Sequence, residues 1–209
     1  MCYVMMVLIA IATLLNGSVQ AQNAQLSGVI ALPAPQASAL ARQTPGYRSR
    51  LGGRGASASV QGTSFSSVII SAHPLSFKAE VQPLAEPVRM TQEKIAFVPH
   101  IVPITAGTTV EFVNLDKVFH NVFSLTPGAK FNIGRKPTGD VVARRVDYVG
   151  QIKLFCDIHP RMNATILSLD TPYFAPADKA GTYLLSELPP GEYEIRLYHP
   201  SLKGSTEKL

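Results

Sequence analysis

From about Glu80 onward, the chain consists of short apolar segments separated by turn residues at regular spacing. In the segment TTVEFVNL, Val110 and Phe112 alternate with Glu111 and Val113, and VVARRVDY alternates in the same way. Alternation with a period of two places successive side chains on opposite faces of a strand. Several short strands at this spacing are typical of a β-sandwich or barrel. The chain is therefore predicted to be all-β, and its sequence shows no internal repeat and no long amphipathic helix.

The segment QIKLFC, which ends at Cys156, predicts where a reactive side chain points. Ile152, Leu154 and Cys156 share one face of the expected strand, and Gln151 and Lys153 share the opposite one. The thiol of Cys156 is therefore expected on the apolar side at the end of a strand. His159 falls in the turn that follows, and Met162 comes three residues after it.

The chain has two cysteines, and the other one is Cys2. Cys2 precedes an apolar run that is short for a membrane span, and SVQA follows, which suits cleavage after Ala21. Residues 1–21 are thus predicted to be a signal peptide, with an uncleaved anchor as the alternative. After cleavage Cys156 would be a single thiol in an oxidising compartment, where a thiol has to be buried or metal-bound.

Charge and composition exclude some classes of function. The net charge is +5 and 16% of residues are charged, but no cluster of Lys and Arg with interleaved aromatic residues indicates nucleic-acid binding. Residues 33–64 are rich in Pro, Gly, Ser and Ala and are predicted to be a flexible linker. This segment contains four arginines, Arg42, Arg48, Arg50 and Arg54, which could dock on an acidic partner. A solvated loop without such a partner is the favoured interpretation.

The loop CDIHPRM combines a thiolate, an imidazole and a thioether within seven residues, Cys156 to Met162. These soft to borderline donors suit copper better than calcium or magnesium. A zinc site commonly uses more cysteines and histidines than this chain offers. Two other interpretations of the loop remain open as alternatives to a copper site. One is a nucleophilic Cys–His pair, and the other is a buried structural cysteine beside a surface histidine.

The segment NLDKVFHNVFSL carries a further candidate ligand, His120, which lies 36 residues before Cys156. Asn121 directly follows it. With AGTTVEFVN at 106–114, it resembles the cupredoxins, the blue copper proteins such as plastocyanin and amicyanin. The loop CDIHPRM is similar to the short amicyanin loop, including Pro160 after the histidine. The resemblance covers about residues 88–169.

This resemblance implies a Greek-key β-sandwich with one type 1 copper ion. It implies His120, Cys156 and His159 as strong equatorial ligands and Met162 as the weak axial ligand. Asn121 would tie the two ligand-bearing segments together by hydrogen bonding, unless it is an ordinary turn asparagine.

The resemblance also implies that electrons leave through His159, with Ile158 and Pro160 forming an apolar surface around the imidazole edge. From Lys130 to Arg161 the chain carries seven Lys and Arg against three Asp, so an acidic redox partner is a further expectation. A solvated strand face without a steering role is an equally open interpretation.

The segment from Thr171 onward predicts further strands. Tyr193, Ile195 and Leu197 alternate with charged residues, and PPGE predicts a type II turn with Pro190 and Gly191 at its centre. This part resembles the second half of a carboxypeptidase-regulatory-like, or transthyretin-like, β-sandwich. Its first half would be LSGVIAL at 26–32 and FSSVIISA at 65–72.

The domain prediction is therefore a cupredoxin domain at 80–169, inserted into or packed on a small sandwich made from 22–79 and 170–209. This combination resembles periplasmic proteins labelled methylamine-utilisation or plastocyanin-like.

The expected function is that of a periplasmic or secreted blue copper protein. It would carry single electrons between a donor and an acceptor protein, with no enzymatic activity and no stable membrane span after signal cleavage. The alternatives are a copper-handling protein without redox turnover and a β-sandwich interaction module with a vestigial metal site. The other histidines, His73, His100 and His199, receive no functional role.

Overall fold

The structure is a computed structural model, and it describes residues 23–30, 65–199 and 205–208. The predicted signal peptide and the linker arginines lie outside the described residues. Within the described part of the chain, no helix is long and apolar enough to cross a bilayer.

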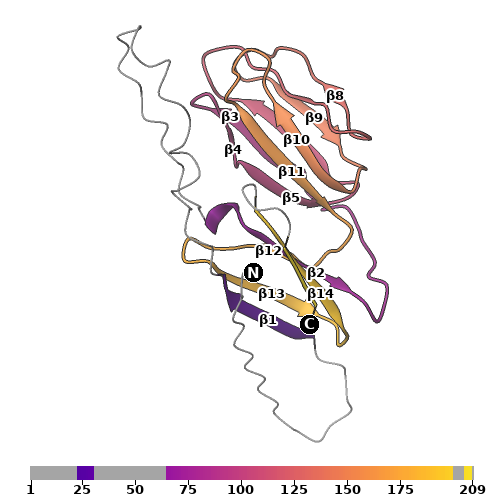
Figure 1. The fold of residues 1–209 in the computed structure, drawn as a ribbon. Helices are drawn as coiled ribbons and strands as arrows, with labels where there is room; N and C mark the ends of the chain where they lie inside the picture. Colours follow the sequence, from indigo (N-terminus) through magenta and orange to yellow (C-terminus); the bar gives the residue numbers. More distant parts are fainter. Residues whose placement is uncertain (1–22, 31–64, 200–204, 209) are drawn as a thin grey trace, which may run out of the picture.

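The described residues are almost entirely β structure, which confirms the all-β prediction, and they form two lobes (Figure 1). The first lobe holds β3 (Val88–Glu93), β4 (Ala96–Val98), β5 (Ile101–Thr105), β6 (Thr109–Asn114), β7 (Phe123–Ser124), β8 (Phe131–Asn132), β9 (Val141–Arg145), β10 (Gly150–Phe155) and β11 (Asn163–Leu169). The second lobe holds β1 (Ala24–Val29), β2 (Ile69–Pro74), β12 (Phe174–Pro176), β13 (Thr182–Leu188), β14 (Tyr193–Tyr198) and β15 (Ser205–Lys208).

The first lobe is a sandwich of two sheets. One sheet has the strand order β4-β3-β6-β9, and the other has the order β5-β11-β10-β7-β8. The chain passes repeatedly between the two sheets, because β5 leaves the first sheet, β6 returns to it, and β9 returns again after β7 and β8. Each sheet contains one parallel pair, β3 with β6 and β11 with β5.

The core of the first lobe lies between these sheets. The expected alternation is present in β6, where Val110 and Phe112 are buried, and in β10, where Ile152 and Leu154 are buried. Residues from both sheets meet in one apolar cluster, which also contains Cys156 and Met162. Two of the candidate ligands, Cys156 and Met162, thus belong to the core of the first lobe.

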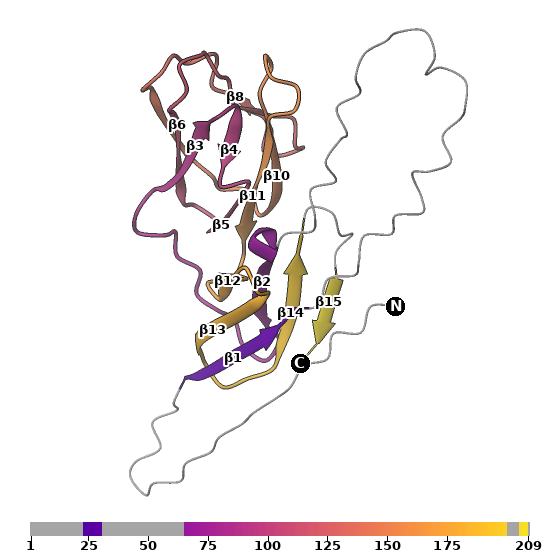
Figure 2. The same ribbon diagram turned by 90° about the vertical axis from the view of Figure 1, so that its left-hand side faces the viewer.

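The second lobe brings together strands from both ends of the described chain. β1 pairs with β13, and β2 lies between β12 and β14 in a separate sheet (Figure 2). Both sheets contribute to a second apolar cluster, in which Ile70 and Ala72 of β2 pack with Leu185 of β13 and Ile195 of β14.

The two lobes contact each other through β11 and β5 on one side and β2 and β14 on the other. β11 is buried on both faces, and its Leu167 and Leu169 pack with Ile101 and Ile69 in a third apolar cluster. Lys153 of the first lobe donates hydrogen bonds from Nζ to the Tyr198 hydroxyl at 3.0 Å and to Thr165 at 3.1 Å.

Three local expectations differ from the structure. Residues 65–67 form a 3₁₀ turn, so the expected strand begins only at Ile69. The alternating segment of β9, an edge strand of its sheet, is mostly exposed, and only Val142 is half-buried within it. Gly191 lacks the positive φ that the central glycine of a type II turn requires, so that turn prediction is wrong.

Candidate metal centre

Cys156 immediately follows β10, and the pleat of this strand turns its side chain inward. The residue is 4% exposed and belongs to the apolar cluster of the first lobe. The orientation predicted from the alternation of QIKLFC is therefore confirmed. A thiol this buried offers little access to a substrate, which disfavours a nucleophilic Cys–His pair.

The loop after Cys156 is closed by main-chain hydrogen bonds. The N–H of Met162 donates to the carbonyl of His159 at 2.9 Å, and the N–H of Cys156 donates to the carbonyl of Met162 at 3.2 Å. The side chain of Met162 is 2% exposed and packs in the same cluster as Cys156, whereas His159 is half-buried. The loop thus keeps three candidate donors at one end of the sandwich.

His120 comes from a different part of the chain, the loop between β6 and β7. Its main chain exchanges two hydrogen bonds with Lys136, N–H to carbonyl at 3.1 Å and carbonyl to N–H at 2.6 Å. The imidazole is completely buried. Because both sides of the main chain are bonded, His120 has little freedom to leave its position.

The three side chains converge on one point. The Sγ of Cys156 lies 3.6 Å from Nδ1 of His159 and 4.0 Å from Nδ1 of His120, and one donor atom from each residue lies within 4.8 Å of the others. The two imidazole rings are 4.7 Å apart between centroids, at an angle of 58°. The His120, Cys156 and His159 group can therefore hold one metal ion between its donors.

These distances fit a metal ion with thiolate and imidazole ligands. Bonds of about 2.3 Å to sulfur and about 2.0–2.1 Å to nitrogen, at open angles, separate sulfur from nitrogen by about 3.6–3.8 Å. The observed separations of 3.6 and 4.0 Å lie close to that range. One thiolate and two imidazoles, with the Met162 thioether buried in the same apolar cluster as the thiol, form a donor set that suits copper.

Asn121 contacts the site through its main chain. Its N–H donates to the Sγ of Cys156 at 3.5 Å and so links the two ligand-bearing segments. Its side chain is buried, and among the described residues Oδ1 has no hydrogen-bond partner. The hydrogen bond that links the two segments in the structure is therefore made by the peptide N–H of Asn121.

Asp116 is a contact of the site that the sequence analysis missed. Its Oδ2 accepts a hydrogen bond from Nε2 of His120 at 2.7 Å and one from the N–H of Ile95 at 2.8 Å. Its Oδ1 accepts from the N–H of Lys94 at 2.7 Å. Burial raises the pKa of Asp116, but the hydrogen bonds from Ile95, His120 and Lys94 outweigh burial and hold the pKa below its ordinary value.

The outer surface of the loop is mixed. Ile158 is half-buried against the core cluster, whereas Pro160 is exposed. The neighbouring Asp157 forms an ion pair with Arg135 at 3.2 Å. The half-buried His159 is therefore the candidate ligand with the most direct path to solvent, since Cys156, Met162 and His120 are all buried.

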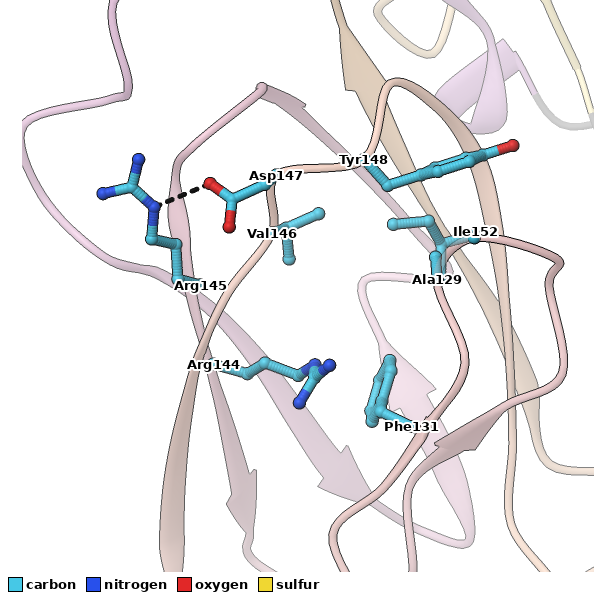
Figure 3. A pocket seen from close by; sticks show the side chains of 9 residues that line it. Ala129, Phe131, Arg144, Arg145, Val146, Asp147, Tyr148 and Ile152 are labelled. Atoms are coloured by element: carbon cyan, nitrogen blue, oxygen red, sulfur yellow. Dashed lines mark hydrogen bonds and ion pairs between the residues drawn. The ribbon is translucent and has the colours of Figure 1, made fainter.

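Two cavities lie away from this group. One, of about 150 Å³, sits where β10 begins, whereas Cys156 follows the end of that strand; Figure 3 shows its Arg144, Phe131 and the Arg145–Asp147 ion pair. The other, of about 330 Å³, lies between the lobes and is lined partly by His73 and Asp170. Neither cavity includes a candidate ligand.

His73 is a second residue whose contacts the sequence analysis missed. Nδ1 lies 3.1 Å from Oδ1 of Asp170, and Nε2 lies 3.0 Å from the hydroxyl of Ser71. Burial, followed by the charge of Arg196, holds the pKa of His73 below its ordinary value, against the opposing effects of Asp170 and Glu194. His100, in contrast, is an exposed histidine whose Nε2 lies 3.2 Å from Oδ1 of Asn163.

Comparisons with known proteins give limited likenesses. No family model matches the chain, and no curated protein matches it. Among solved structures, a purple cupredoxin from Nitrosopumilus maritimus is 25% identical at a TM-score of 0.35, over 39% of this chain and 98% of that one. An amicyanin from Paracoccus versutus is 22% identical at a TM-score of 0.37, over 47% of this chain and 97% of that one.

A copper-containing nitrite reductase from Thermus scotoductus SA-01 is 26% identical at a TM-score of 0.37, over 45% of this chain but only 24% of that one. Each of these likenesses covers less than half of the chain. The assignment of a metal centre therefore rests on the convergence of His120, Cys156 and His159.

Proposed function

We propose that the protein carries single electrons between a donor and an acceptor protein by means of one type 1 copper ion. His120, Cys156 and His159 would be the strong ligands and Met162 the weak axial one. The observation that carries this proposal is the convergence of one buried thiol and two imidazoles, with sulfur-to-nitrogen distances of 3.6 and 4.0 Å.

The rigidity of the surroundings favours electron transfer over simple copper handling. His120 is held by two main-chain hydrogen bonds, and the Cys156–Met162 loop is closed by two more. Ligands that cannot move far accommodate both copper oxidation states with little rearrangement. A protein that delivers its metal needs instead a site that opens, and two of the three group members are buried.

The route for the electron would be the His159 imidazole. His159 is the half-buried member of the group, and Ile158 and Pro160 flank it. A redox partner docked there would reach the imidazole edge across an apolar contact. One electron enters from a reduced donor and one leaves to an oxidised acceptor, and the protein itself forms or breaks no bond.

An acidic partner is supported only in part by the surface charges. Of the seven basic residues between Lys130 and Arg161, Arg135 pairs with Asp157 and Arg145 pairs with Asp147. Arg144 lies over the ring of Phe131 at 4.4 Å. Lys153 is hydrogen-bonded to Tyr198 at the contact between the lobes. Charge steering would therefore depend mainly on Lys130, Lys136 and Arg161. The signal segment 1–21 would export the protein to the periplasm or the exterior.

Two measurements distinguish an electron carrier from a copper-handling protein. Voltammetry of the copper-loaded protein should give a reversible one-electron couple, and a challenge with a Cu(I) chelator should remove the reduced metal only slowly. Rapid loss of Cu(I) to the chelator, with no reversible couple, would support copper handling and contradict the proposal.

A further inference from the structure

We propose that Asp116 is a positioning residue for the metal centre. It fixes the tautomer of His120 so that Nδ1 faces the thiolate before any metal binds, and it biases the site toward the more oxidised metal. The bias toward the more oxidised metal rests on the proposed copper site. The tautomer of His120 does not, because it exists in the metal-free protein.

The contact itself determines the tautomer. A carboxylate only accepts hydrogen bonds, so the short 2.7 Å contact requires Nε2 of His120 to carry the proton. A neutral imidazole has one protonated nitrogen, which leaves the lone pair on Nδ1. Nδ1 is the atom that lies 4.0 Å from the Sγ of Cys156. The ligand lone pair is thus directed toward the thiol side of the site.

The carboxylate is itself held by the turn between β3 and β4. Lys94 and Ile95 both have positive φ, 54° and 57°, which is the conformation of a two-residue type I′ hairpin turn. That conformation is unfavourable for a β-branched residue such as Ile95. Both N–H groups of the turn donate to Asp116. The turn therefore presents two donors that compensate for its strain and clamp the carboxylate.

The loop that carries Asp116 is also held. The N–H of Asp116 donates to Oδ1 of Asn114 at 3.0 Å, and Nδ2 of Asn114 donates to the carbonyls of Val118 at 2.8 Å and Lys136 at 2.9 Å. The Asp116 side chain is 15% exposed and that of His120 is fully buried. The hydrogen bond therefore lies where water screens it weakly.

Two consequences follow for a metal at this site. A carboxylate on the outer nitrogen makes the imidazole a stronger donor and adds negative charge, and both effects favour the higher oxidation state. The ligand is also fixed in advance, so binding loses less ordering entropy. Groups that orient a ligand in this way typically contribute about 10–100-fold to metal affinity.

The first experiment uses the metal-free full-length protein. Long-range ¹H–¹⁵N NMR spectra of the histidine rings should show His120 protonated at Nε2 and unprotonated at Nδ1 in the wild type. In Asp116→Asn the preference should weaken, with a second ring signal or exchange broadening. A wild-type His120 protonated at Nδ1 would overturn the proposal, whether or not the variant folds.

The second experiment compares Asp116→Asn with the matched control Asp157→Asn, both loaded with copper. Asp157 also lies beside a ligand and also carries one negative charge, but it pairs with Arg135 and not with an imidazole. Asp116→Asn should raise the reduction potential and weaken Cu(II) binding by about 10–100-fold. Asp157→Asn should change both quantities much less.

Equal changes in the two variants would show a general charge effect and would overturn the role of Asp116 as a positioning residue. If the wild-type protein bound no copper in a coloured site, the proposed function would fail. The NMR result on the metal-free protein would still decide the tautomer part, so the two failures are distinguishable.

Discussion

At the residue scale, Met162 differs from the other candidate ligands because a thioether is a weak donor. It is buried in the same cluster as Cys156. We expect Met162→Leu to retain copper, because the thiolate and the two imidazoles carry most of the binding, and to shift the reduction potential. Copper titration and voltammetry measure the two effects. A variant that loses copper as fully as Cys156→Ser would contradict the axial role.

Ile158 tests the electron route at the same scale. Replacing it with Glu places a charge beside His159 without altering a ligand, so electron exchange should slow sharply while the copper spectrum stays unchanged. Stopped-flow exchange with a redox partner measures the rate. The control is Leu184→Glu, which places the same charge at an exposed apolar residue of β13 in the second lobe. Equal slowing in both variants would argue against an exit through His159.

Local sequence predicts some of these residues and not others. The inward position of Cys156 follows from strand alternation alone, which is a property of neighbouring residues. The contacts of Asp116 depend on a turn that lies 22 residues earlier in the chain. Its spacing of four from His120 would indicate proximity in a helix, but in a loop the same spacing predicts nothing. The role of His73 likewise requires Asp170, which only the folded chain brings near.

At the element scale, β13 provides a pair of adjacent leucines with opposite environments. Leu185 is 2% exposed and packs in the cluster of the second lobe, whereas Leu184 is 52% exposed. We expect Leu185→Ala to lower the free energy of unfolding by about 2–5 kcal/mol, because it leaves a cavity. Leu184→Ala should change it by less than about 0.5 kcal/mol.

Chemical denaturation of the metal-free protein measures both values. β1 pairs with β13, placing Leu26 opposite Leu185, so the loss should also reduce hydrogen-exchange protection in β1. We propose that segments 22–79 and 170–209 form one small domain, and this transmitted loss tests that proposal. Unchanged protection in β1 would indicate that the two segments fold independently.

At the scale of the whole molecule, His73 links the lobes and should make stability depend on pH. Its pKa lies below the ordinary value of 6.5, so the folded protein binds fewer protons there than the unfolded chain. The contribution is therefore present above about pH 6.5 and is lost as the pH falls below it. The charged groups that face His73 are Asp170, Arg196 and Glu194.

The prediction is a melting temperature that falls from pH 7 to pH 5 more steeply in the wild type than in His73→Gln. Glutamine retains hydrogen-bonding groups toward Ser71 but does not titrate. Both curves are recorded on metal-free protein, so His120 and His159 contribute equally to each. Parallel curves would show that His73 does not contribute to the pH dependence.

The central claim concerns one copper ion bound by the Cys156 thiolate, and the visible and EPR spectra test it most directly. Adding one equivalent of Cu(II) to the mature protein should produce an intense colour from thiolate-to-copper charge transfer, with an unusual EPR signal. Cys156→Ser should abolish both. A colourless wild-type adduct with an ordinary EPR spectrum would contradict the account.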